Sequence, residues 1–196
     1  MKSIFSLFFI TTLFFLSSCS NTCNCTIDTS NIYANDSTIN QIDSMKIWEL
    51  LNVSSSNHRS KFRLAILPSY KCERRTFTLV DTSNSPYIMV NYFNSPEKNQ
   101  LINLESNQIE GFKQILNKNC FWTMKSNSEA KTLDGVIWLL EANSPTPNLC
   151  TKRNKHVVFR KGSDSTFYEI CDNLLKLANS SHNEQEKINN KCWTGE

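Results

Sequence analysis

The sequence predicts an α+β domain, with a mostly antiparallel, curved sheet of about six strands and helices packed on one face. Three observations lead to this prediction. Four strand-like segments follow one another without helical segments between them, an amphipathic helical segment separates them from two further strand candidates, and a second amphipathic segment closes the domain. A parallel α/β sheet is the alternative, but it needs helical crossovers for which the first four segments leave no room. We expect this single domain to span residues 59–178.

The first four strand candidates are short and rich in β-branched and aromatic residues. Turn-forming residues separate them, and their starts are spaced by about a dozen residues, which favours a meander of consecutive antiparallel strands. They are residues 62–67, 76–80, 87–93 and 100–104.

A helix is predicted after the fourth strand. Ser106 is the expected N-cap, because a serine hydroxyl can accept a hydrogen bond from a free backbone N–H of the first turn. The apolar residues that follow recur at helical spacing, so one face of this helix should pack on the sheet. They are Ile109, Phe112, Ile115 and Leu116.

The strongest local pattern begins at Asp134-Gly135, a turn-forming pair. The apolar run 136–140 that follows lacks alternation, which is typical of a strand buried on both faces, so we expect a central position for it. The segment 156–160 is expected to return antiparallel beside this strand. That pairing would bring Glu141 near His156.

The last helix is expected to start at a cap formed by Ser163 or Asp164 and to run through about Ala178. Cys171 falls on its apolar face, where a cysteine behaves as a small buried hydrophobe. The residues from 179 to 196 form a polar tail.

The N-terminal residues 1–18 have the pattern of a signal peptide. Lys2 precedes an apolar run, Ile4–Leu16, that is too short to span a bilayer as a helix. The segment Leu16-Ser17-Ser18-Cys19 resembles the site at which bacterial lipoprotein precursors are cut and lipidated, so we expect acylation of Cys19. The alternative is an ordinary secretory signal in which Cys19 has no special role.

Residues 19–58 are predicted to be a polar tether, with one short helix from about Ile42 to Leu51. Removal of the signal peptide takes away one lysine, so the formal net charge falls from +3 to +2. Basic residues form no continuous run, and nucleic acid is therefore not an expected partner.

The chain has eight cysteines, and setting aside Cys19 leaves an odd number. In an exported protein some should form disulfides, and at least one must stay free or bond to another chain. Cys120, beside two aromatic residues, is expected to be a buried hydrophobe like Cys171. The spacing Cys23-x-Cys25 could hold a soft metal, but no second ligand pair follows, so we predict no metal site. The candidate disulfide cysteines, with partners left open, are Cys23, Cys25, Cys72, Cys150 and Cys192.

Polar and aromatic residues of the paired strands form a candidate binding corner. A carboxylate beside a histidine is the minimum for acid–base chemistry, but turn geometry, cross-strand pairing and core packing explain the same residues more simply. We therefore assign no catalytic residue. No cofactor is expected either, because the four glycines are too scattered to form a phosphate-binding loop. The corner consists of Asp134, Trp138, Glu141, His156 and Arg160.

Several motifs within residues 60–178 resemble a group of bacterial proteins, many of them lipoproteins. This chain departs from that group in three places: the turn between the paired strands is longer and carries Cys150, Lys161 replaces an aromatic residue, and Asp164 replaces a proline. The shared motifs are Phe121-Trp122, Asp134-Gly135-x-x-Trp138-x-Leu140-Glu141, His156-Val157-Val158-x-Arg160-x-x-Ser163 and Cys171-x-x-Leu174-Leu175-x-Leu177.

These observations together predict a lipid-anchored protein of the bacterial cell envelope that faces the periplasm, on either the inner or the outer membrane. Its partners would be the bilayer, through acylated Cys19, and a protein or envelope component that a non-catalytic module binds. Neutralisation of a toxin is one form such binding could take. The alternative function is a small envelope hydrolase that uses Glu141 and His156.

Overall fold

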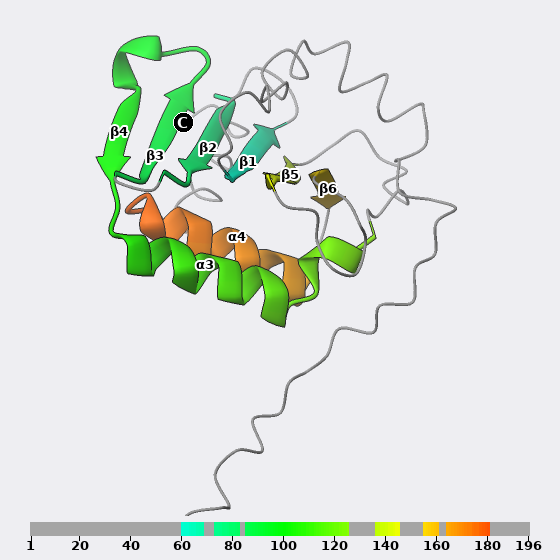
Figure 1. The fold of residues 1–196 in the computed structure, drawn as a ribbon. Coiled ribbons are helices and arrows are strands. Elements are labelled where there is room, and N and C mark those ends of the chain that lie inside the picture. Colours follow the sequence, from blue (N-terminus) through cyan, green and yellow to red (C-terminus); the bar gives the residue numbers. More distant parts are fainter. Residues whose placement is uncertain are drawn as a thin grey trace, which may run out of the picture.

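The computed structural model describes residues 60–68, 73–82, 85–125, 136–145, 155–160 and 164–180. Over these residues the structure has six strands, two α-helices and two short 3-10 helices. The arrangement of the strands and α-helices can be followed in Figure 1. In chain order they are β1 (Lys61–Pro68), β2 (Arg75–Val80), β3 (Tyr87–Tyr92), η1 (Pro96–Lys98), β4 (Gln100–Asn103), α3 (Ser106–Lys118), η2 (Phe121–Thr123), β5 (Val136–Asn143), β6 (Lys155–Arg160) and α4 (Ser165–Leu177).

The six strands form one antiparallel sheet in the order β4-β3-β2-β1-β5-β6. Strands β1 to β4 are the predicted meander, which is confirmed. Strand β5 does not extend the sheet beyond β4, because the chain returns through α3 and adds β5 to the other edge of β1. The first strand of the sheet is therefore an interior strand.

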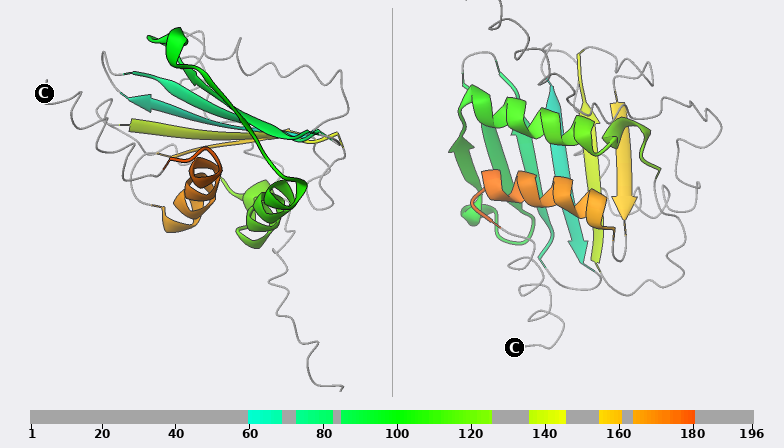
Figure 2. Two further views of the ribbon diagram at one scale, coloured as in Figure 1. Left: turned by 90° about the vertical axis from the view of Figure 1, so that its left-hand side faces the viewer. Right: turned by 90° about the horizontal axis from the view of Figure 1, so that it is seen from below.

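Both α-helices lie on the same face of the sheet (Figure 2). The α+β prediction with helices on one face is confirmed. The core fills the space between the helices and the sheet, and burial of its apolar side chains is the main stabilising contribution. The largest fully buried side chains include Phe77, Phe112, Phe121 and Phe167.

The first helix, α3, begins one residue earlier than predicted, and its cap is different. Glu105 occupies the N-cap position, and its backbone N–H donates to the Gln108 side-chain oxygen at 2.8 Å. The expectation that Ser106 caps this helix is therefore wrong. The capping box requires a side chain three residues after the cap, and Gln108 supplies it for Glu105. The predicted apolar face is confirmed by the burial of Ile109, Phe112 and Leu116.

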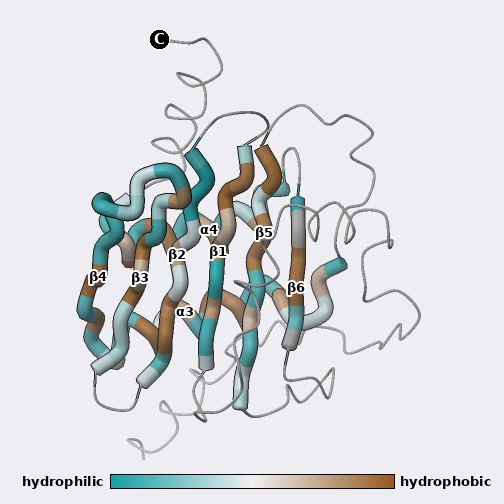
Figure 3. Tube along the Cα trace, turned by 90° about the horizontal axis from the view of Figure 1, so that it is seen from above, coloured by the Kyte–Doolittle hydropathy of each residue, from teal (hydrophilic) through white to brown (hydrophobic). Residues whose placement is uncertain are grey.

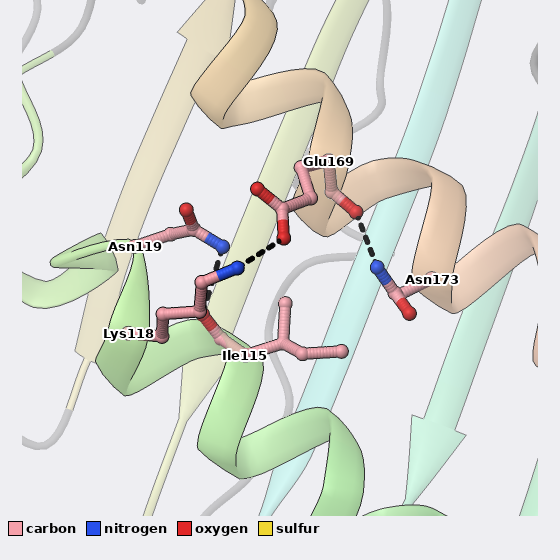
Figure 4. Close-up of polar contacts among 5 residues, drawn as sticks. All are labelled: Ile115, Lys118, Asn119, Glu169 and Asn173. Carbon is pink, nitrogen blue, oxygen red and sulfur yellow. Dashed lines mark hydrogen bonds and ion pairs between the residues drawn. The ribbon is translucent and has the colours of Figure 1, made fainter. Parts of the chain in front are cut away.

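The second helix, α4, is capped by Asp164, one of the two predicted candidates. Its carboxylate Oδ1 accepts a hydrogen bond from the Phe167 N–H at 3.0 Å. The two helices are joined at one end, where the Lys118 ammonium donates to the Glu169 carboxylate at 2.9 Å (Figure 4). Because both side chains are exposed to solvent, this ion pair contributes little to stability.

Strand β5 is buried on both faces, as its continuous apolar pattern predicts. Leu139 and Leu140, which point to opposite faces, are both fully buried. The strand lies between β1 and β6, and β6 pairs with it in the predicted antiparallel direction. It is an interior strand, one position from the edge of the sheet.

The strand registers assign each side chain to a face. The helix face includes Phe62, Ala142 and His156, which are aligned across β1, β5 and β6. We call the opposite side the outer face; Figure 3 views the sheet from that side. One row of the outer face, in register from β4 to β5, is Leu101, Met89, Thr78, Arg63 and Glu141.

Within the described residues, neither helix is long and apolar enough to cross a bilayer. The predicted signal peptide, the tether with its short helix, and residues 181–196 of the tail lie outside the described part of the chain.

Candidate functional site

The structure separates the predicted binding corner into three different environments. Trp138 and Arg160 lie opposite each other on β5 and β6, on the helix face. His156 lies on the same face, near the other end of β6. Glu141 lies on the outer face, because it is opposite Val157 and adjacent to the inward-facing Ala142. Asp134 is outside the described residues.

Arg160 is buried at the N-terminus of α4 and is held by an ion pair. Its Nε donates to Asp164 Oδ2 at 2.7 Å, and its guanidinium carbon lies 5.6 Å from the centre of the Phe167 ring. The opposite residue, Trp138, is also buried and meets the Tyr168 ring edge to face, with ring centres 5.4 Å apart. These contacts join the last strand to the last helix.

Asp164 therefore has two roles, as the cap of α4 and as the counter-ion of Arg160. Partial burial by itself raises the pKa of this carboxyl group. The hydrogen bonds from the Arg160 side chain and the Phe167 N–H outweigh it, so the pKa of Asp164 lies below its ordinary value of 3.8. The carboxylate stays charged at neutral pH and is engaged on both oxygens.

His156 is a buried structural residue at the start of β6. Its Nε2 lies 3.0 Å from the backbone carbonyl of Met124; since a carbonyl only accepts, this nitrogen carries the proton. The imidazole also meets the Phe121 ring edge to face, with centres 5.0 Å apart, and lies 6.3 Å from the Trp122 ring. The motif Phe121-Trp122 is thus brought to the strand that carries His156.

On the outer face, Glu141 lies directly opposite Arg63 of β1. The Glu141 side chain is only 1% exposed, and Arg63 is half-buried. Burial lowers the pKa of the Arg63 guanidinium, while attraction to the Glu141 carboxylate acts in the opposite direction. Opposite charges at directly paired positions stabilise a sheet, and burial strengthens their attraction.

The side chains of Glu141 and His156 are consequently too far apart to act together. Their side chains leave the sheet on opposite faces, so the sheet itself lies between the carboxylate and the imidazole. Proton transfer between two such groups requires hydrogen-bond distance, directly or through one water molecule. The geometry favours separate structural roles for the two residues.

The two described cysteines differ from each other. Cys171 is a free, fully buried thiol on α4, as predicted; burial, together with the nearby carboxylates Asp172 and Asp164, raises its pKa well above the ordinary value. It is therefore protonated and unreactive at neutral pH.

Cys120 forms a disulfide, so the expectation of a second buried thiol is wrong. The neighbouring aromatic residues indicated burial, but Cys120 is only half-buried, in the turn after α3, with a left-handed φ of 53°. Because Cys171 is free, the partner of Cys120 is outside the described residues. Also outside them are Cys19 and the candidate disulfide cysteines Cys23, Cys25, Cys72, Cys150 and Cys192.

Over the described ranges, histidine, cysteine and carboxylate side chains form no group of three or more that could hold a metal ion. Several of the charged contacts in these ranges join different parts of the fold. Examples are Arg160 with Asp164, and Lys113 with Asp81 at 2.8 Å.

The sequence analysis did not identify Arg63 as the residue opposite Glu141 or Asp164 as the counter-ion of Arg160. Arg63 is the single charge within the otherwise apolar segment 62–67, and that isolation was a usable signal. Its partner could not be identified, because the pairing of β1 with β5 was not predicted. Asp164 was identified as a cap but not as the counter-ion of Arg160, although the two are four residues apart.

The chain was also compared with known proteins. Neither models of protein families, nor curated proteins, nor solved structures match this chain.

Proposed function

We propose that this protein is a bacterial lipoprotein of the cell envelope, whose folded domain is a non-catalytic binding module. The observation that carries the proposal is the N-terminal pattern, in which the apolar run Ile4–Leu16 leads directly into Ser17-Ser18-Cys19. The Cys19 thiol would take the lipid, and residues 19–58 would tether the domain to the membrane on the periplasmic side. The motifs that resemble those of bacterial lipoproteins support the same proposal.

The structural use of the polar residues supports a non-catalytic role. Arg160 is engaged by Asp164, His156 by the Met124 carbonyl, and Glu141 lies opposite Arg63. A general acid or base must reach a substrate, whereas these groups are buried against partners of the same chain. The hydrolase alternative needs Glu141 and His156 together, and their opposite faces weigh against it.

The lipid anchor is tested by replacing Cys19 with serine in the full chain, produced in a bacterial host. The wild-type protein should incorporate radioactive palmitate and sediment with the membranes, because several acyl chains make membrane binding long-lived. Cys19→Ser should lose both the label and the membrane association. Cys23→Ser, which removes a nearby thiol, is the control and should retain both.

The opposite result is equally clear. If Cys19→Ser remains with the membranes, or if the wild-type protein takes up no palmitate, the lipoprotein proposal is wrong.

The binding role is tested separately, by cross-linking in membranes and purification of the anchored protein. Reproducible recovery of one defined envelope component supports a binding module, and recovery of background alone contradicts it.

A further inference from the structure

We propose that the outer edge of β4 pairs with β4 of a second copy of this chain. The two strands would run antiparallel about a two-fold axis at Leu101, and the two sheets would join into one continuous sheet. β4 forms the edge of the sheet, next to β3 (Figures 1 and 3). The inference goes beyond the proposed function and does not depend on lipid attachment.

The backbone of β4 presents unused hydrogen-bonding groups at this edge. The Leu104 N–H donates to the Pro86 carbonyl at 2.8 Å, which makes these two residues a hydrogen-bonded pair of the β3–β4 ladder. In an antiparallel ladder such pairs occur at every second residue, so Gln100 and Ile102 also turn their backbone groups toward β3. The N–H and C=O groups of Leu101 and Asn103 consequently point away from the sheet.

The side chains at this edge are apolar and exposed. Leu101 is 64% exposed and Met89 is 39% exposed, and the other large hydrophobic side chains of the described residues are more buried. The two are directly opposite each other on β4 and β3, on the outer face. The apolar pair therefore ends at the same edge as the unused backbone groups.

Strand β4 is short, but its sequence lacks the residue types that usually block edge pairing. Its four residues, Gln100–Asn103, include neither a charged residue nor a proline. Glu97 and Lys98 precede the strand and Glu105 follows it, so these charged residues lie outside the four residues that would pair.

A second copy fits this edge in one register particularly well. With Leu101 on the two-fold axis, the backbone N–H of each Leu101 can donate to the backbone carbonyl of Leu101 in the second copy. The Asn103 N–H can donate to the Asn99 carbonyl of the second copy. Leucine then lies directly opposite leucine, flanked on each side by Met89. This is a self-complementary contact, as a two-fold symmetric dimer requires.

The register makes a specific test possible. The full chain is purified in mild detergent, and its mass is followed by sedimentation over a range of concentrations. Leu101→Lys alone and Leu101→Glu alone should each weaken the dimer at least about tenfold, because the apolar contact is lost and like charges lie directly opposite. An equimolar mixture of the two variants should restore dimers, since lysine then faces glutamate.

Gln114→Lys and Gln114→Glu introduce the same charges at an exposed position of α3 and should leave the dimer unchanged. Circular dichroism checks that all variants fold, which is expected because Leu101 is exposed. A wild-type chain that stays monomeric at every concentration overturns the proposal. So does a dimer that the Leu101 variants do not weaken, or variants that do not complement each other.

A photo-reactive phenylalanine at position 101 tests the same contact in membranes. A cross-linked product of twice the chain mass supports self-pairing, if the same group at position 114 gives none. A product of another mass identifies a different partner at this edge, and with it the second-copy proposal fails.

Discussion

Arg63 and Glu141 lie directly opposite each other on β1 and β5, and the Glu141 carboxylate is buried on the outer face of the sheet. Arg63→Met should lower the free energy of unfolding by about 1–2 kcal/mol, because it removes a positive charge that attracts the buried Glu141 carboxylate. The double variant Arg63→Met/Glu141→Leu should lose clearly less than the sum of the single variants. Urea unfolding of the wild type, Arg63→Met, Glu141→Leu and the double variant measures the coupling energy between the two residues.

The exposed pair Lys118 and Glu169 is the matched control for this cycle. Lys118→Met and Glu169→Leu should show a coupling of about 0–1 kcal/mol, because solvent screens the pair. Equal coupling at the two sites would mean that burial adds nothing to the interaction between Arg63 and Glu141.

Asp164→Ala should destabilise the protein at neutral pH by about 1–2 kcal/mol, through loss of the α4 cap and of the Arg160 counter-ion. The pKa of Asp164 is lowered in the folded state, so its stabilising contribution is complete above the ordinary pKa. It is lost as the pH falls through the folded-state value. The stability difference between wild type and variant should therefore shrink toward zero in acid.

Denaturant unfolding of both proteins across this pH range is the measurement. Glu97→Ala, which removes an exposed carboxylate of η1, is the control and should change little at any pH. If the difference in free energy of unfolding between wild type and Asp164→Ala stays constant down to the most acidic pH at which both fold, the Asp164 carboxylate does not stabilise the protein through its charge.

His156→Ala should cost about 2–4 kcal/mol, because it removes a buried ring that packs on Phe121 and leaves the Met124 carbonyl without its donor. Thermal unfolding of the variant tests this expectation. Asn107→Ala, at an exposed position of α3, should stay within about 0.5 kcal/mol of wild type. If His156→Ala is as stable as wild type, the histidine is not the structural residue described here.

The Cys171 thiol should resist alkylation by a maleimide in the folded protein and react once the protein is unfolded, because it is fully buried and its pKa is raised. Cys120 should react only after reduction. Mass spectrometry of the digested protein distinguishes the two sites. Rapid labelling of Cys171 under native conditions would place the thiol at the surface.

The local part of this fold could be predicted from the sequence. The strands of the described residues were predicted from their β-branched, aromatic and apolar content between turn-forming residues. The two described helices were predicted from the spacing of their apolar residues. The cap of α3 was assigned one residue too late, since Ser106 is a good cap in isolation while the Glu105–Gln108 arrangement depends on the actual start of the helix.

The non-local part could not be predicted in the same way. Nothing in residues 61–68 or 136–143 specifies that β1 and β5 pair, because many apolar strands could form that contact. Whether the residues of the predicted corner meet depends on this topology and on which face of the sheet each side chain takes. A shift of one residue in register exchanges the two faces, which is why Glu141 and His156, close along neighbouring strands, lie on opposite sides.

The interior position of β1 has a consequence for how the chain reaches this fold. The hairpins of the meander join neighbouring segments and can form early, but the second edge of β1 stays open until β5 arrives from the far end of the domain. A chain still emerging from the ribosome or a translocation channel would expose that edge to neighbouring chains. A holding chaperone that shields it should raise the yield of native protein.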